Sequence, residues 1–413
     1  MNYSHFMSAS EQYIKAHPEQ QFAVLYTDFT NFKFLNETYG YNEGNQVLKE
    51  YADFLKDEPG ILHARISADS FVSLYETADM EQIRENFTIR AEQFSKKAHQ
   101  YYDRCKLGIT GGMEHVDILQ DSIALTVDNA NMARKSLKKD GSVQVAIYTA
   151  EMRKEQQRQM EIVSHMTEAL ENKEFRVYLQ PKISTSKEVL GGAEALFRWI
   201  HPTEGFIPPN RFIPIFEKNG FILKLDDYML EEIARVQAQW ISEGRRIVPI
   251  SVNVSRAHFT REDLAEHICA IVDKYNVPHS VIELELTESA FFDDKNVLLN
   301  TVKKLRAAGF QVSMDDFGAG YSSLNSLKEL QIDVLKIDAD FFRGADAEER
   351  GLLIVSEVID LAKKLNMKIV AEGIESKEQV EFLTEQECDL IQGYFYAKPM
   401  PVAEFAQKYS VQI

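Results

Sequence analysis

The sequence predicts an α/β protein in which a small α/β sandwich precedes a (β/α)8 barrel. The chain has 413 residues, which is too long for one ordinary domain. From about Met160 onward, eight short apolar or β-branched runs recur between amphipathic stretches with helical spacing. This alternation is typical of a mostly parallel sheet closed into a barrel. Residues 20–150 alternate in the same way with fewer units, which indicates the smaller sandwich.

The barrel strands are predicted at eight runs. The first two runs lie too close in sequence for a helical crossover, so we expect them to be antiparallel to each other. The later spacers read as helices that end on stop residues, such as the glycine after "NVLLNTVKKLRAA" and the asparagine after "ERGLLIVSEVIDLAKKL". The eight runs cover 175–182, 189–198, 247–255, 281–288, 311–318, 334–338, 368–374 and 390–396.

The domain organisation follows from these patterns. We expect the sandwich over residues 1–150 and the barrel over residues 173–413. Between them, residues 151–172 are polar, contain neither glycine nor proline, and place their apolar residues at loosely helical intervals. This stretch is predicted to be a connecting helix.

Composition and charge narrow the class of protein. The chain is 45% hydrophobic and 27% charged, as in folded globular proteins, and its net charge of −18 argues against binding long nucleic acid by electrostatics. Its three cysteines are far apart and have no zinc-binding spacing, which indicates reduced thiols. The N-terminus does not resemble a signal peptide, and no apolar run has the length of a membrane span. We therefore expect a cytoplasmic protein. A homodimer is the expected assembly, although none of these patterns indicates it.

Polar residues gather in or just after the C-terminal halves of the predicted strands, where barrel active sites are built. A single carboxylate there would be interpreted as a solvated loop residue, but repetition on successive strands favours a functional site. Asp315 and Asp316 are adjacent, and two carboxylates resist sharing a dry site without a cation between them. The polar set is Gln180, Glu194, Arg198, Asn253, Glu285, Glu288, Asp315, Asp316, Lys336, Glu372 and Gln392.

An oxygen-rich cluster of this kind suits hard divalent cations, Mg²⁺ or Mn²⁺, better than zinc or copper. A pair of ions would explain the adjacent aspartates, and paired ions recur in enzymes that cleave phosphoesters. In such a site Lys336 can orient the attacking water, and the planar guanidinium of Arg198 suits a phosphate oxygen. His201 and His258 are interpreted as solvated loop imidazoles.

Seven ordered motifs between residues 160 and 410 resemble the EAL family. They are "EALFRW", "SVNVS", "ELTES", "DDFGAGYSS", "LKID", "AEGIE" and "QGYFYAKP". The resemblance implies a bacterial phosphodiesterase that cuts cyclic di-GMP to the linear dinucleotide pGpG with two Mg²⁺ or Mn²⁺ ions. It also implies a metal-binding set of Glu194, Asn253, Glu285, Asp315, Asp316 and Glu372, with Asp315 as the bridge.

The same resemblance implies the other roles. Glu194, Lys336 and Glu372 are the catalytic group: Lys336 holds the hydrolytic water, and Glu372 is the competing candidate for the general base. Ala319 stands where the family commonly has threonine, which we interpret as a change that tunes the rate. Substrate contacts are implied for Gln180, Arg198, Asp316 and Gln392, and Glu288 resembles the anchor of the loop that follows.

The first 150 residues resemble a GGDEF domain, the cyclase that makes cyclic di-GMP from two GTP molecules. The signature position reads "SADSF", so Ser67 and Ala68 replace both glycines, and side chains there should obstruct a nucleotide. Asp28, Asn36 and Asp69 survive at nucleotide- or metal-contacting positions. We expect no cyclase activity. Residual GTP binding and ordinary turn or cap roles are both open interpretations of these three residues.

Three functions stay open at this point. The leading hypothesis is a cyclic di-GMP phosphodiesterase with an inactive cyclase domain in a regulatory or GTP-sensing role. The second is a receptor that binds cyclic di-GMP without cutting it and signals through a protein partner. Because no metal ligand and no lysine of the motif is lost, the sequence favours the enzyme. The third treats the N-terminal domain as a protein-interaction module and the barrel as its switch.

Overall fold

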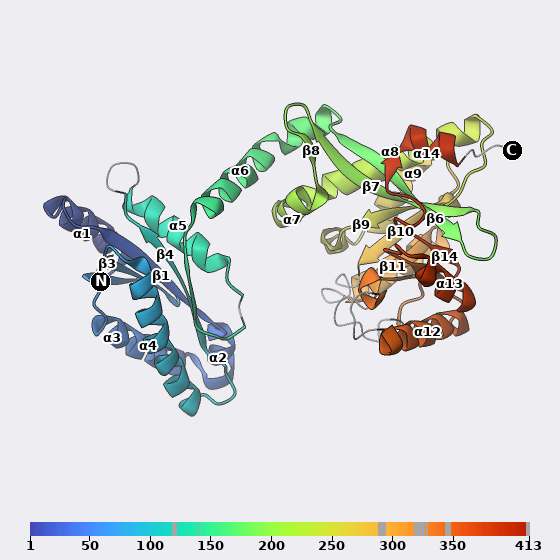
Figure 1. Ribbon diagram of the computed structural model, residues 1–413. Coiled ribbons are helices and arrows are strands. Elements are labelled where there is room, and N and C mark those ends of the chain that lie inside the picture. The colour runs from blue at the N-terminus through green and yellow to red at the C-terminus, as the bar shows by residue number, and fades with distance from the viewer. Residues whose placement is uncertain are drawn as a thin grey trace. The chain divides into compact units, whose positions relative to one another are not determined.

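The computed structural model describes residues 1–117, 122–138, 140–287, 295–317, 327, 329–342 and 348–409. It divides into two compact units, Met1–Met160 and Glu161–Ile413 (Figure 1). Within the described residues, none of the helices combines the length and the apolar character needed to cross a membrane.

The N-terminal unit is a three-layer sandwich around a five-stranded sheet. Its elements are α1 (Tyr3–Ala16), β1 (Phe22–Thr30), α2 (Phe32–Tyr39), α3 (Tyr41–Lys56), β2 (Leu62–Ser67), β3 (Ser70–Glu76), α4 (Met80–Tyr101), β4 (Gly108–His115), α5 (Ile123–Lys135) and β5 (Gln144–Ile147). The strand order is β2-β3-β1-β4-β5. Alternate residues of β1 enter two cores: Val24 and Tyr26 pack with α1 and α5, whereas Leu25 and Phe29 pack with α2, α3 and α4. The predicted small α/β sandwich is confirmed.

The segment predicted to connect the domains is helical, as α6 (Ala150–Glu171). Most of its side chains are polar and solvent-facing, as expected for a helix with few apolar neighbours. Near its C-terminal end, Ile162 and Ala169 are buried in a cluster that includes Phe175 and Trp199 of the second unit. The last turns of α6 are therefore packed against the barrel.

The second unit holds a sheet whose strands close into a barrel. Its strands are β6 (Phe175–Ser184), β7 (Leu190–His201), β8 (Gly205–Ile207), β9 (Ile250–Val254), β10 (Ile282–Thr287), β11 (Gln311–Phe317), β12 (Val334–Ile337), β13 (Lys368–Ala371), β14 (Leu390–Ile391) and β15 (Met400–Pro401). The order is β15-β6-β14-β13-β12-β11-β10-β9-β7-β8, and β6 also pairs with β7, which closes the ring. Strand β6 is antiparallel to β7 and β14, so the predicted barrel with an early antiparallel strand is confirmed.

Helices surround this barrel (Figure 1). Asn366 lies just after the helix α12 (Glu348–Lys364) with a φ of 57°, the left-handed conformation expected of an asparagine stop. The helical elements are α7 (Pro209–Asn219), α8 (Ile222–Ser242), η1 (Arg256–Thr260), α9 (Leu264–Asp273), η2 (His279–Val281), α10 (Lys295–Ala307), η4 (Ala339–Phe342), α12 (Glu348–Lys364), α13 (Lys377–Glu385) and α14 (Val402–Lys408).

Strand β10 shows how the sequence divides the barrel into a dry outer layer and a polar interior. Ile282, Leu284 and Leu286 are fully buried in the apolar cluster beneath the outer helices. Glu283 and Glu285 alternate with them and are also buried, which places both carboxylates inside the barrel. The interior of this barrel is therefore charged, and its carboxylates need cations nearby.

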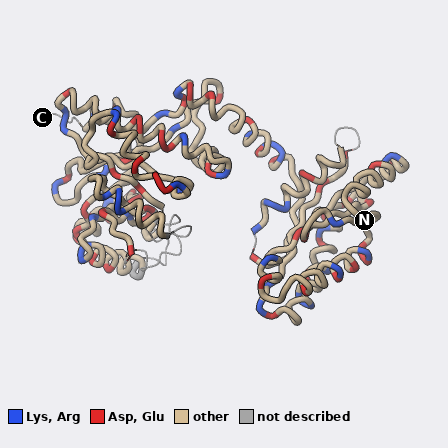
Figure 2. The backbone as a smooth tube through the Cα atoms, turned by 180° about the vertical axis from the view of Figure 1, so that it is seen from behind, with Lys and Arg blue, Asp and Glu red and all other residues tan. Residues whose placement is uncertain are grey.

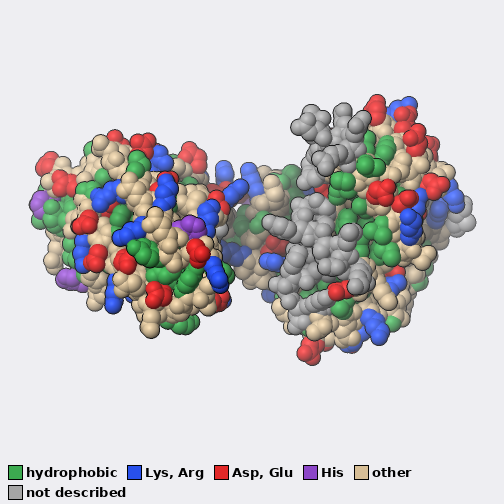
Figure 3. All heavy atoms as spheres, turned by 90° about the horizontal axis from the view of Figure 1, so that it is seen from below, with side chains coloured by type: hydrophobic (Ala, Val, Ile, Leu, Met, Phe, Trp, Pro, Cys, Tyr) green, Lys and Arg blue, Asp and Glu red, His purple; other side chains and the backbone are tan. Residues whose placement is uncertain are grey.

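The surface charge is dispersed. Acidic and basic residues are interspersed along the helices of both units (Figure 2). On the face of the N-terminal unit seen in Figure 3, acidic, basic and hydrophobic side chains form small interspersed patches. The net charge of −18 is therefore not gathered on one element.

Candidate active site

The carboxylates at the mouth of the barrel converge on one buried ammonium group. Lys336 lies on β12 and has no exposed surface. Its Nζ lies 2.7 Å from Glu372 Oε1, 2.8 Å from Glu285 Oε2 and 3.0 Å from Asp315 Oδ1. Glu194 Oε1 is 4.0 Å away. Four of the acids predicted from separate strands therefore meet around the predicted lysine.

Strand register explains why these residues meet. In the parallel ladders, Glu285 on β10 lies opposite Asn253 on β9. Asp315 on β11 lies opposite Thr287, which is two residues after Glu285 and on the same face of β10. Glu372 follows β13 directly, and its backbone N–H donates to the carbonyl of Ile337 (3.0 Å). Paired positions in neighbouring strands place their side chains on the same face of the sheet, here the barrel interior.

Amide side chains frame one side of this cluster. Gln392 Nε2 donates to Glu194 Oε2 and, at 3.2 Å, to Gln180 Oε1. Asn253 Nδ2 donates to Glu194 Oε1 at 3.3 Å. Gln180 in turn donates to the carbonyl of Ala397 (3.2 Å). The network joins β6, β7, β9 and the segment after β14, and it fixes the orientation of the Glu194 carboxylate.

Burial and crowding separate the proton affinities of the acids. Burial raises the pKa of Glu194 to about 7, because it outweighs the attraction of Lys336, and the charges of Glu285 and Asp315 add to the rise. Burial likewise raises the pKa of Glu372 well above its ordinary value. Burial would also raise the pKa of Glu285, but Lys182 and Lys336 overcome it and lower this pKa to about 2. The cluster holds more acids than its lysines can neutralise, so Glu194 and Glu372 hold their protons more tightly than exposed carboxyl groups do.

Arg198 lies beside this cluster, outside the ring of contacts around Lys336. Its guanidinium stacks over the rings of Tyr178 (5.8 Å) and Phe206 (5.9 Å) and donates to the carbonyl of Phe197 (2.7 Å). Partial burial lowers its pKa. A guanidinium beside aromatic rings can bind a planar or anionic group. Glu288, Ala319 and the side chain of Asp316 lie outside the described residues.

Sequence reasoning missed a second buried lysine. Lys182 on β6 is 1% exposed, and its Nζ donates to Ser251 Oγ (2.9 Å), Glu283 Oε1 (3.2 Å) and Glu285 Oε1 (2.9 Å). The signal was present, because Lys182 stands two residues after Gln180 and so shares its face of the strand. The alternation in "VIELELTE" likewise places Glu283 on the interior face with Glu285.

The two histidines near the strand ends are not solvated loop imidazoles, so that interpretation was wrong. His258 is 3% exposed, and its Nε2 lies 3.3 Å from Asp226 Oδ2, because η1 folds back on α8. His201 ends β7 and is half-buried near Glu174 and His165.

Glu174, His165 and His201 come close enough together to hold a metal ion. Trp199 Nε1 (2.9 Å) and His165 Nε2 (3.1 Å) both approach the Glu174 carboxylate. His201 Nδ1 accepts backbone N–H groups of the next turn, at 3.2 and 3.4 Å. Its Nε2 therefore carries the proton in the neutral ring and offers no lone pair to a metal. We interpret these contacts as an anchor for α6.

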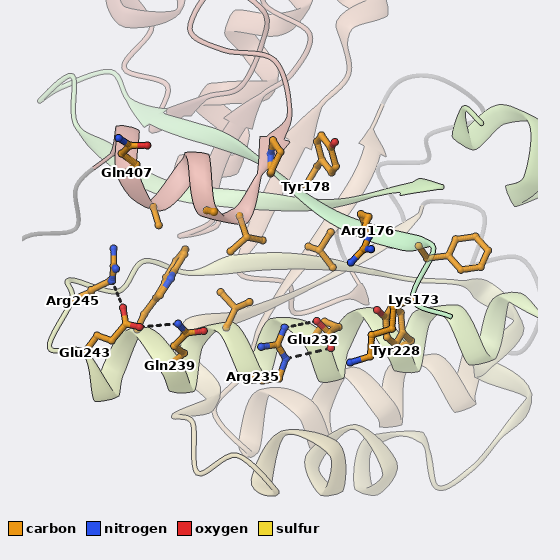
Figure 4. Close-up of a pocket in the computed structure, with 18 residues that line it drawn as sticks. Lys173, Arg176, Tyr178, Tyr228, Glu232, Arg235, Gln239, Glu243, Arg245 and Gln407 are labelled. Carbon is orange, nitrogen blue, oxygen red and sulfur yellow. Dashed lines mark hydrogen bonds and ion pairs between the residues drawn. The ribbon is translucent and has the colours of Figure 1, made fainter. Parts of the chain in front are cut away.

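A cavity of about 920 Å³ lies on the outer wall of the second unit, between α8 and α14 (Figure 4). Its rim pairs Arg235 with Glu232 (2.6 Å) and Arg245 with Glu243 (2.5 Å). None of the acids around Lys336 lines it. Two further cations, Lys173 and Arg176, line it beside these two ion pairs, so it lacks the convergent acids that make the barrel mouth the candidate active site.

The surviving acids of the N-terminal unit are close together and already have a cation. Arg134 on α5 is 7% exposed, and its Nη1 lies 2.8 Å from Asp28 Oδ2 on β1. Burial and the neighbouring Asp28 raise the pKa of Asp69 to about 6. Ala68, at the tip of the β2–β3 turn, has a φ of 40°, a conformation that favours the glycine it replaces. Asn36 lies elsewhere, with its side chain against Gly44.

Comparison with known proteins identifies both units. Residues 164–399 match the EAL domain model, and residues 1–144 match the GGDEF domain model, described as diguanylate cyclase. Among curated proteins, the chain is 32% identical over 397 residues to the bifunctional diguanylate cyclase/cyclic di-GMP phosphodiesterase MucR of Pseudomonas aeruginosa. It is 30% identical over 392 residues to the cyclic di-GMP phosphodiesterase PdeR of Escherichia coli. In both comparisons 94% of this chain is covered, but only 57% and 58% of the relatives.

Solved structures agree. The PaMucR phosphodiesterase in complex with c-di-GMP superposes with a TM-score of 0.56 at 36% identity, covering 59% of this chain and 99% of that one. An EAL domain protein from Listeria monocytogenes gives a TM-score of 0.53 at 29% identity, covering 60% and 98%.

Proposed function

The chain belongs to the EAL domain family, and on that premise we propose that it hydrolyses cyclic di-GMP to linear pGpG. One observation carries the proposal: Glu194, Glu285 and Asp315 from three strands, with Glu372 directly after a fourth, surround Lys336 inside the barrel mouth. The similarity to PaMucR, whose structure is a c-di-GMP complex, supports the choice of substrate.

We propose that two divalent ions, Mg²⁺ or Mn²⁺, are held by Glu194, Asn253, Glu285, Asp315, Asp316 and Glu372. The described donors fit such ions, because they are carboxylate and amide oxygens. Glu372 Oε1 supports the fit: it is buried 2.7 Å from Lys336 Nζ, yet it has no partner with hydrogen-bond geometry. Bound ions would activate water and stabilise the leaving oxygen.

The side chains of the protein supply binding, orientation and proton handling. Lys336, whose ammonium donates to Glu285 but makes no hydrogen bond to Glu372 Oε1, would hold the attacking water and stabilise negative charge that develops in the transition state. Glu372, whose pKa is raised by burial, is the candidate that accepts the proton of this water. Arg198 would contact a phosphate or guanine of the substrate. Gln180 and Gln392 would orient substrate or water, Asp316 would contribute a substrate contact, and Glu288 would anchor the adjoining loop.

For the N-terminal unit, we propose a regulatory role without cyclisation. Ser67 and Ala68 occupy the positions where the backbone must approach a nucleotide closely, and the Asp28 carboxylate is paired with Arg134. GTP is the candidate regulatory ligand. The homodimer also stays a prediction, which the mass of the particle in solution tests.

The test incubates the purified chain with cyclic di-GMP and either Mg²⁺ or Mn²⁺ and separates the nucleotides by chromatography. We expect pGpG to accumulate, and none to form without a divalent ion or with Glu194→Ala. If the folded wild-type chain binds cyclic di-GMP but forms no pGpG at any ion concentration, the receptor function replaces the enzyme. A GTP titration of the same reaction tests the regulatory role, which an unchanged rate at saturating GTP would remove.

A further inference from the structure

We infer that Lys182, on the first barrel strand β6, is a positioning residue for the metal ligand Glu285. The inference rests on the proposed function, because it concerns how the proposed metal site is held in shape. Lys182 is buried beneath that site and lies in none of the seven motifs that identify the barrel.

The geometry of Lys182 is fully determined by its contacts. An ammonium group has three protons, and Nζ meets three acceptors, Ser251 Oγ, Glu283 Oε1 and Glu285 Oε1, at 2.9, 3.2 and 2.9 Å. The side chain is 1% exposed, so solvent does not compete for these protons. Lys182 thus has no proton left to donate to a substrate, and its role must act through the residues that it holds.

Glu285 is held from two sides. Its Oε1 accepts from Lys182 (2.9 Å) and its Oε2 accepts from Lys336 (2.8 Å), and the residue has no exposed surface. The two lysines reach it from β6 and β12, which lie on different parts of the ring. Since Lys182 occupies Oε1, the other oxygen is turned toward Lys336, Asp315 and Glu372, where the ions would bind.

This arrangement has a known physical consequence. A hydrogen bond to the outer oxygen of a carboxylate ligand helps to fix its orientation, and removing such a partner typically weakens metal binding or activity about 10- to 100-fold. Lys182 also pairs with Glu283, so a variant that only removes the lysine leaves the buried Glu283 carboxylate without its cation and Glu285 with Lys336 alone. The decisive comparison must therefore keep the buried charge balanced.

The test compares Glu283→Gln with the double variant Lys182→Met/Glu283→Gln. The double variant removes one positive and one negative charge, so the buried charge stays balanced, while Glu285 Oε1 loses the hydrogen bond from Lys182. The measurement is Mn²⁺ affinity by calorimetric titration of the full chain without substrate. Fluorescence of Trp199 and Trp240, both buried in the barrel unit, checks that each variant is folded. We expect Glu283→Gln to bind nearly as wild type and the double variant to bind about 10- to 100-fold more weakly.

Turnover gives an independent readout. If Lys182 acts through a metal ligand, raising the Mn²⁺ concentration should restore much of the kcat of the double variant, whereas it should not restore Lys336→Ala. Equal Mn²⁺ affinities in Glu283→Gln and the double variant would overturn the role of Lys182 while leaving the proposed function intact. If wild type and Glu283→Gln bind no Mn²⁺, the proposed function fails, and the role of Lys182 fails with it.

Discussion

Each unit of this protein places buried or half-buried acids beside a cation, but the balance of charge differs. In the N-terminal unit, Asp28 and Asp69 face the single guanidinium of Arg134, which also lies over the ring of Tyr26 (5.5 Å). In the barrel, two lysines face five acids among the described side chains. These acids are Glu194, Glu283, Glu285, Asp315 and Glu372.

The difference shows what each cluster requires. Two carboxylates beside one arginine leave one excess negative charge, which a proton on Asp69 neutralises below about pH 6, so the N-terminal pair has less need of a metal. Five acids with two lysines carry an excess of negative charge in a dry site, which protons or divalent ions must neutralise. We therefore interpret the N-terminal acids as neutralised mainly by Arg134, and the barrel acids as requiring bound metal ions. The following predictions test that contrast.

The largest effect is expected for Asp315→Ala. This substitution removes the proposed bridge between the two ions, so both metal affinity and turnover should fall, turnover by about a thousandfold or more. Metal titration and single-turnover rates measure the two effects. Near-normal Mn²⁺ affinity in this variant would contradict the assignment of Asp315.

Lys336→Ala should separate binding from chemistry. It leaves the carboxylates in place and removes a positive charge that repels metal ions, so Mn²⁺ affinity should be kept or increased. Turnover should fall about a hundredfold or more, because a positioned cation acts mainly in the transition state. Loss of metal binding in Lys336→Ala, with retention in Asp315→Ala, would show that the two roles are inverted.

Synthesis of cyclic di-GMP from GTP should be absent. The reason is the replaced signature at Ser67 and Ala68 and the pairing of Asp28 with Arg134. The assay uses Glu194→Ala, so that any product made would not be degraded. Cyclic di-GMP formed by this variant would disprove the prediction.

Arg134→Ala should make the carboxylates of Asp28 and Asp69 available to a metal ion. Without its guanidinium, Asp28 and Asp69 would face each other unpaired, and we expect one additional, roughly millimolar Mn²⁺ site. The measurement is the number of ions bound per chain in an Asp315→Ala background, which weakens the barrel site. Lys135→Ala is the matched control, because this neighbour on α5 is exposed. An unchanged number of bound ions in Arg134→Ala would contradict the interpretation that Arg134 takes the place of a metal ion beside Asp28 and Asp69.

The smallest effect concerns pH. The pKa of Asp69 is about 6 in the folded unit and near 4 in an unfolded chain, so the folded state holds this proton more tightly. The N-terminal unit should therefore lose stability as pH rises from about 4 to 6, by on the order of 1 kcal/mol because the group is only partly buried. Hydrogen exchange of β1 and β3 measures this, since both tryptophans lie in the barrel. Asp69→Asn should remove the dependence, and a slope that persists in Asp69→Asn would contradict it.

Local pattern in the sequence was sufficient to predict the fold and the mouth of the barrel. Runs of period two separated by helical spacers predict strands in chain order, and the C-terminal ends of parallel strands must meet at one face. This is why Glu285, Asp315 and Lys336 could be expected together before any coordinates. The antiparallel first strand also followed from a local fact, the short connection between the first two runs.

The pairing of each buried charge with its partner was decided only by the tertiary structure. Lys182 lies 103 residues from Glu285 in sequence, and only the pairing of β6 with both β7 and β14 brings the two together. Arg134 meets Asp28 because α5 packs across the sheet, and His258 is buried because η1 folds back on α8. The composition of a strand predicts which side chains face inward. The sequence does not predict which buried cation neutralises which acid, because the partners lie on elements that come together only in the folded structure.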